Sequence, residues 1–147
     1  GLAMEICRLD SSWRRQVTDL VLETFHAFVA PGYSREGVNS FCAFVGDEAA
    51  MEALSCWGAV EKGELAGVLA ANSSGDQVCL FFVAAGWQGK GIGRQLWERF
   101  LQEGNGAEIT VHASPFAVPI YRRLGFHATA EEQQADGMRY TPMTFRR

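Results

Sequence analysis

Residues 88–93 read Gln-Gly-Lys-Gly-Ile-Gly, a segment that consists almost entirely of backbone. An unbroken apolar run at residues 78–83 precedes it, and an amphipathic pattern at residues 92–103 follows it. We therefore expect a buried strand, a glycine loop and a helix in that order. Free N–H groups and the positive end of the helix dipole would then point at one spot, where they can bind an anion such as a phosphate.

Two cationic side chains, Lys90 and Arg94, flank the expected first turn of this helix. A positive charge there opposes the helix dipole and is mildly unfavourable unless a negative ligand is bound. We therefore expect at least one of them to contact an anion, the alternative being that both are solvated surface residues. The sequence leaves these two interpretations open.

The spacing of the glycines excludes two common phosphate-binding loops. A Walker loop needs Ser or Thr directly after its lysine, but Gly91 follows Lys90. A dinucleotide-binding loop has the spacing G-x-G-x-x-G, and Arg94 stands where its third glycine would be. Glu108 lies near the distance of a ribose-binding acid, but at the start of the next strand rather than at its far end.

A second segment at residues 108–126 predicts a strand followed by a short helix. Ser114 is a suitable N-cap, Pro115 suits the first helical position, and Gly125 can close the helix in the left-handed conformation. Tyr121 would lie near the end of this helix. From the pattern alone, its ring is expected to pack in the core with its hydroxyl at the surface.

The two segments together carry a family resemblance. The loop has the spacing Q-x-x-G-x-G, and residues 109–126 end in the pattern Y-x-x-x-G-F. With both motifs the chain resembles the GNAT superfamily of acyl-CoA-dependent N-acetyltransferases. The resemblance implies an α/β (α+β) fold with a mixed, largely antiparallel central sheet, helices on both faces, and a V-shaped splay between the two central strands.

The resemblance also implies a binding site for acetyl-CoA, with the pantetheine arm lying in the splay. The amides of that arm would pair with the strand edge near Phe82 and Val83, and an N–H near Val83 would stabilise the oxyanion. The chain departs from the family pattern in two places. Many members have Pro and an acidic residue where this chain has Ala85 and Gly86, and an Asn where it has Ser114. Because the serine side chain is shorter, Ser114 either contacts CoA or only caps the helix. The expected CoA-binding residues are Phe82, Val83, Gln88, Gly89, Lys90, Gly91, Ile92, Gly93, Arg94 and Ser114.

Two catalytic roles follow from the resemblance and from the chemistry of acetyl transfer. Tyr121 is expected to be the general acid that protonates the departing CoA thiolate. For the general base, strand alternation places Glu108, Thr110 and His112 on one face, with His112 nearest the splay. His112 is therefore the candidate base, although a lone histidine at a strand end is often structural.

The acceptor is expected to be a primary amine that attacks acetyl-CoA directly in a ternary complex. No cysteine lies in either motif, so a covalent enzyme intermediate is not expected. Phe28, Tyr33 and Glu36 could line the acceptor pocket or could simply pack. An alternative function is a non-catalytic acyl-CoA-binding sensor or interaction module.

Composition favours a single domain over residues 1–147, because the chain is 48% hydrophobic and shows no repeat or linker. The net charge of −4 without a basic stripe argues against nucleic-acid binding. No signal peptide or membrane span is expected, and the native start is expected at or near Met4 rather than at Gly1.

The cysteines show no pattern of a metal site or a disulfide framework, so we expect neither. Reduced thiols predict a cytoplasmic protein, which would act as a monomer or a homodimer. The four cysteines are Cys7, Cys42, Cys56 and Cys79.

The remaining elements are expected as follows. A strand at residues 4–9 leads into a helix capped at Asp10 or Ser11, which ends near Pro31. Ser34 begins a second helix. Hairpins are expected at residues 56–71, turning at Lys62-Gly63, and at residues 126–145, turning at Asp136-Gly137.

Overall fold

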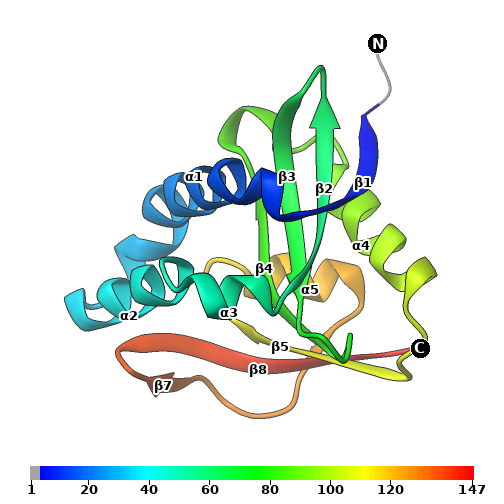
Figure 1. The fold of residues 1–147 in the computed structure, drawn as a ribbon. Helices are drawn as coiled ribbons and strands as arrows, with labels where there is room; N and C mark the ends of the chain where they lie inside the picture. The colour runs from blue at the N-terminus through cyan, green and yellow to red at the C-terminus, as the bar shows by residue number, and fades with distance from the viewer. Residues whose placement is uncertain (1–3) are drawn as a thin grey trace.

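The computed structural model describes residues 4–147 and is built around one eight-stranded sheet (Figure 1). Its strand order is β1-β2-β3-β4-β5-β8-β6, with β7 paired to β8. Within the described residues, β4 and β5 form the one parallel pair, and the other neighbours are antiparallel. The sequence predicted that the native chain starts at or near Met4; the residues before it, Gly1 to Ala3, lie outside the described residues. The strands are β1 (Glu5–Leu9), β2 (Ser55–Glu61), β3 (Glu64–Ala71), β4 (Gln77–Val83), β5 (Glu108–Ala113), β6 (His127–Ala128), β7 (Gln133–Ala135) and β8 (Met138–Arg146).

Helices cover both faces of the sheet, which confirms the expected mixed fold. Helices α1 and α2 lie on one face, and α4 and α5 lie on the other (Figure 1). Across the described part of the chain, no helix is both long enough and apolar enough to cross a bilayer. The α-helices are α1 (Arg14–Thr24), α2 (Arg35–Val45), α3 (Glu48–Glu52), α4 (Ile92–Glu103) and α5 (Val118–Leu124).

Local capping explains where the first helices begin and end. The Asp10 carboxylate accepts the Ser12 amide at the start of the 3-10 turn that leads into α1. Helix α1 continues into a π-helical turn at Phe25–Val29, and a 3-10 turn at Ala30–Gly32 then ends the helical run. The hydroxyl of Ser34 caps α2, as expected, by accepting the Gly37 amide.

The central strands separate after two residue pairs. The parallel pairing of β4 with β5 joins Gln77 to Thr110 and Val78 to Val111, and goes no further along either strand. This V-shaped splay confirms the expectation from the sequence. A β-bulge coincides with it, because β3 pairs Ala71 with Val78 and Ala70 with Leu80, leaving Cys79 without a partner.

The bulge changes which face of the sheet the apolar side chains cover. Val78 packs in the core beneath α4, whereas Leu80 packs in the core beneath α1 and α2. Without the extra residue, positions 78 and 80 would face the same side. An apolar run in a sequence gives no sign of such a bulge, because residues of both faces are equally apolar.

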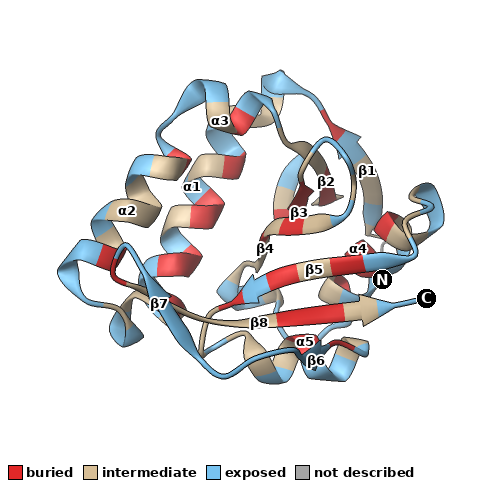
Figure 2. Ribbon diagram, turned by 90° about the horizontal axis from the view of Figure 1, so that it is seen from below, coloured by how far each residue is buried: buried red, intermediate tan, exposed pale blue. Residues whose placement is uncertain are grey.

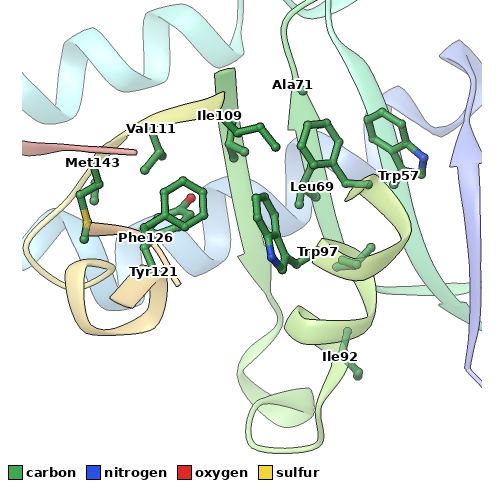
Figure 3. Packing of buried hydrophobic residues seen from close by; sticks show 14 of the residues in the cluster. Trp57, Leu69, Ala71, Ile92, Trp97, Ile109, Val111, Tyr121, Phe126 and Met143 are labelled. Atoms are coloured by element: carbon green, nitrogen blue, oxygen red, sulfur yellow. The ribbon is translucent and has the colours of Figure 1, made fainter. Parts of the chain in front are cut away.

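The larger core lies beneath α4 and α5 and contains most of the buried aromatic rings. Trp97 packs against Phe100, Phe126 and Phe145. Tyr121 lies beside Phe126 in the same core (Figure 3). Burial alternates along β5, and β8 is buried toward its end, whereas β7 is exposed throughout (Figure 2). These core contacts therefore hold α4 and α5, the two helices that border the splay, in place.

Three local features differ from the sequence-based expectations. Helix α5 begins at Val118 rather than at Pro115, because the Ser114 carbonyl accepts the amides of Ala117 and Val118 and closes a separate turn first. The expected strand at residues 126–133 is broken into β6 and β7. Helix α3 was not expected, although Asp47 caps it by accepting the Ala50 amide.

The tip of the β7–β8 hairpin is fixed against α2 by close backbone contact. A Cβ at Gly37 would lie 2.2 Å from the Gly137 carbonyl oxygen. The hydroxyls of Ser34 and Ser40 donate to the carbonyls of Gly137 and Asp136. This contact joins the helical layer to the strand that borders the splay.

We predict that Gly37→Ala lowers the free energy of unfolding by about 1–2 kcal/mol, measured by urea denaturation. The added methyl group meets backbone atoms of Gly137, so it forces α2 off the hairpin at a cost of about 2–3 kcal/mol, in the upper part of the range for overpacking. This cost exceeds the gain of about 1 kcal/mol from helix propensity. Gly86→Ala is the control, since a Cβ there meets nothing within 4 Å. Equal stability of the two variants would contradict the close contact.

Candidate active site

A cavity of about 580 Å³ occupies the splay between β4 and β5. Its walls come from β4, from the glycine loop and start of α4, from β5 and α5, and from the π-helical turn and α2. The cavity therefore brings together the two segments that the sequence singled out. Of the expected site residues, those that line it are Phe82, Val83, Gln88, Gly89, Gly91, Ile92, Gly93, His112, Ser114 and Tyr121.

The edge of β4 supplies backbone groups to this cavity. The Ala84 amide donates to the Ala66 carbonyl of β3 at 2.9 Å. Because hydrogen-bonding direction alternates along an antiparallel pair, the main-chain groups of Phe82 also face β3. Those of Phe81 and Val83 face the opposite side, where β5 has diverged. Phe81 is thus an edge residue that the sequence reasoning missed. Phe82 lines the cavity with its side chain rather than with its main-chain groups.

The glycine loop places further amides at the mouth of the cavity. Gly89 and Gly91 have φ angles of +76° and +81°, a conformation that favours glycine. Gly91 is the N-cap residue of α4 and supplies no side-chain cap, so the first N–H groups of the helix lack intrahelical partners. The Gln88 side chain donates to the Val83 carbonyl at 3.0 Å and ties the loop to the end of β4.

The two cations of the loop differ in their surroundings. Arg94 donates from Nη2 to the Arg123 carbonyl at 3.0 Å, at the C-terminal end of α5. An unpaired helix-end carbonyl therefore accounts for this cation without an anionic ligand. Lys90 forms no hydrogen bond or ion pair within residues 4–147, and neither Lys90 nor Arg94 is among the cavity-lining residues.

Tyr121 reaches the cavity from the core. Its side chain is almost fully buried, with edge-on contacts to Phe81 and Phe126 at centroid distances of 5.8 and 5.1 Å. Burial raises the pKa of the phenol, and the nearby Cys79 adds to this effect. The hydroxyl has no hydrogen-bond partner among residues 4–147, so it keeps its proton at neutral pH and is free to donate it.

His112 and Ser114 lie on the opposite wall. The His112 ring is exposed and stacks on Tyr140 at 4.3 Å, and Tyr140 in turn donates to Gln133 at 3.1 Å. The Ser114 hydroxyl accepts the Ala117 amide at 3.3 Å. Ser114 is thus a capping residue that also lines the cavity. His112 supplies the imidazole among the residues that line the cavity.

The aromatic part of the cavity was largely missed by the sequence reasoning. Of the three residues that the sequence offered for an acceptor pocket, Phe28 and Tyr33 line the cavity, whereas Glu36 is not among the lining residues. Aromatic side chains from the π-helical turn, α2 and the β5–α5 loop complete this part. Their separation in the sequence, from residue 25 to residue 116, left no local signal that they would meet.

Comparison with known proteins agrees with this arrangement. A family model described as an acetyltransferase (GNAT) domain matches residues 29–147. No curated protein gives a significant match.

Solved structures with similar folds include a GCN5-related N-acetyltransferase from Rhodopseudomonas palustris, with a TM-score of 0.83, 18% identity and 99% of each chain covered. PaiA N-acetyltransferase from Thermoplasma acidophilum, solved in complex with coenzyme A, has a TM-score of 0.74 and 15% identity, with 99% of this chain and 100% of that chain covered. The apo form of YjaB from Escherichia coli has a TM-score of 0.77 and 18% identity, with 98% of each chain covered. At these identities the likeness concerns the fold.

Proposed function

The chain belongs to the acetyltransferase (GNAT) domain family, and on that premise we propose that it transfers an acetyl group from acetyl-CoA to a primary amine. One observation carries the proposal: a single cavity is lined by an open strand edge, a glycine loop at a helix N-terminus and a protonated phenol. A strand edge can pair with the amides of a pantetheine arm, and the loop amides can hold a pyrophosphate.

The chemistry requires three groups besides the substrates. The amine nitrogen attacks the thioester carbonyl carbon and forms the C–N bond, and the Val83 N–H stabilises the resulting oxyanion. When the C–S bond breaks, its electron pair leaves with the sulfur, and Tyr121 gives that sulfur its proton. The proton lost by the nitrogen passes to His112, directly or through water, and Tyr121 regains a proton from solvent.

We expect Tyr121→Phe to lower kcat by roughly 100-fold at saturating substrates, because the thiolate then leaves without a proton donor. Since the hydroxyl makes no hydrogen bond with residues 4–147, the free energy of unfolding and the Kd for CoA should stay unchanged. Steady-state assays of CoA release, calorimetry and denaturation measure the three quantities. An unchanged kcat would remove the acid role.

Gly91→Glu should abolish the rise in Tm that CoA produces in the unmodified protein. The carboxylate brings negative charge to the amides that are proposed to hold the pyrophosphate. Gly63→Glu is the matched control, because Gly63 has a φ of +79° and, like Gly91, has open space where a Cβ would be. Both variants carry the same backbone strain, on the order of 1 kcal/mol, but only Gly63→Glu should keep the CoA response. If both keep it, the pyrophosphate lies elsewhere.

His112→Gln should lower kcat/KM for the amine by roughly tenfold or more near neutral pH. The deficit should shrink as the pH rises, because more of the amine is already unprotonated in solution. Rates of the variant and of the unmodified protein, measured across roughly pH 6 to pH 10, give the comparison. A deficit that does not change with pH would assign His112 a structural role.

A further inference from the structure

The part of the cavity that is lined by the π-helical turn and α2 has an aromatic wall. The π-helical turn Phe25–Val29 brings Phe25, Phe28 and Val29 to the cavity, and such turns often occur at functional sites. We call this region the aromatic end. Its lining side chains are Phe25, Phe28, Val29, Tyr33, Phe41, Phe82 and Phe116.

Ring contacts hold the aromatic end together across distant elements. Phe25 stacks on Phe41 of α2 with centroids 4.0 Å apart, and Phe41 meets Phe82 of β4 at 6.0 Å. Phe28 stacks on Phe116 of the β5–α5 loop at 5.2 Å, which joins the two sides of the splay. Phe116 is 39% exposed, so this pair lies where the aromatic end reaches the surface.

The aromatic end offers no counter-charge to a cationic ligand. Among residues 4–147, no Asp or Glu lines the cavity, and Arg123 supplies the charged lining side chain. The Thr24 hydroxyl already donates to the Leu20 carbonyl at 2.7 Å. A polyamine, with several ammonium groups, would be desolvated there without a carboxylate partner.

A separate groove of about 330 Å³ adjoins the cavity at Thr24 and Phe28. It carries the carboxylates of Asp19, Glu23 and Glu64. A polycationic acceptor would favour that groove over the aromatic end. The two regions therefore predict opposite acceptor preferences, which a direct comparison can separate.

We infer that the acceptor is a primary arylalkylamine, whose ring lies in the aromatic end while its nitrogen faces the thioester near Val83. This inference rests on the proposed function. Apolar walls disfavour the ammonium form and so favour the neutral amine that attacks. The amine nitrogen forms the new amide bond, the C–S bond electrons leave with CoA sulfur, and the nitrogen proton goes to His112 or water.

A turnover assay compares three amines at saturating acetyl-CoA by CoA release. They are 2-phenylethylamine, 2-cyclohexylethylamine and spermidine. We expect kcat/KM for 2-phenylethylamine to exceed that for spermidine by at least about tenfold, with 2-cyclohexylethylamine between them, since aromatic pairing adds to apolar burial. Equal or better turnover of spermidine would overturn the inference and point to the acidic groove.

Two variants of α2 test the placement of the ring. Phe41→Leu keeps an apolar side chain but removes an aromatic face from the cavity, and should raise KM for 2-phenylethylamine about 3- to 10-fold with little change in kcat. Phe44→Leu makes the same replacement on the same helix, at a half-buried position outside the cavity lining. Equal changes in KM for the two variants would overturn the placement.

A binding assay separates this inference from the proposed function. Calorimetry on the CoA-saturated protein compares the product amide N-(2-phenylethyl)acetamide with N-acetylspermidine. Tighter binding of the aromatic amide supports the placement of the ring in the aromatic end. If that amide binds tightly but no amine in the panel is acetylated, the result counts against the transferase proposal and leaves the ring-binding role of the aromatic end standing. Failure of the aromatic amide to bind, or tighter binding of N-acetylspermidine, overturns the inference.

Discussion

Hydrogen bonding between β4 and β5 stops after Val78 and Val111, and the rest of the site depends on that separation. Backbone N–H and C=O groups are obligatory hydrogen-bonding groups, so a strand that loses its neighbour must find other partners. Beyond Val78, the edge of β4 faces the cavity instead of β5. The bulge at Cys79 lies where the pairing ends, and it redirects the side chains that follow.

The separation is maintained by contacts on both sides of the sheet. On one side, α4 is held to the first two strands, since Arg99 donates to the Ile6 carbonyl and Trp57 donates to Glu103. On the other, the Gly37–Gly137 contact fixes α2 against the β7–β8 hairpin. Arg94 and the Arg123 carbonyl link the two helices that border the splay. A rigid frame of this kind can keep backbone groups unpaired until a ligand pairs with them.

Much of the frame could be predicted from local patterns. The glycine loop, the helix it begins, the turn at Lys62-Gly63 and the cap at Gly125 depend on residue types next to one another in the sequence. Together with the family resemblance, they predicted the splay and the position of Tyr121.

What could not be predicted depends on contacts between distant residues. The Cys79 bulge lies inside a uniformly apolar run, and its presence depends on the register of β3. Arg94 was expected to oppose the dipole of α4, but it finds its partner 29 residues away on α5. The aromatic end draws its rings from five separate segments of the chain, and so it follows from the tertiary fold rather than from any motif.

The central claim is that acetyl-CoA pairs with the open edge of β4, and amide hydrogen exchange measured by NMR tests it most directly. In the free protein, the amides of Phe81 and Val83 should exchange faster than those of Leu80 and Phe82, which face β3. Saturating acetyl-CoA should slow exchange at Phe81 and Val83 selectively. Unchanged exchange at these two amides in the saturated protein would contradict the claim.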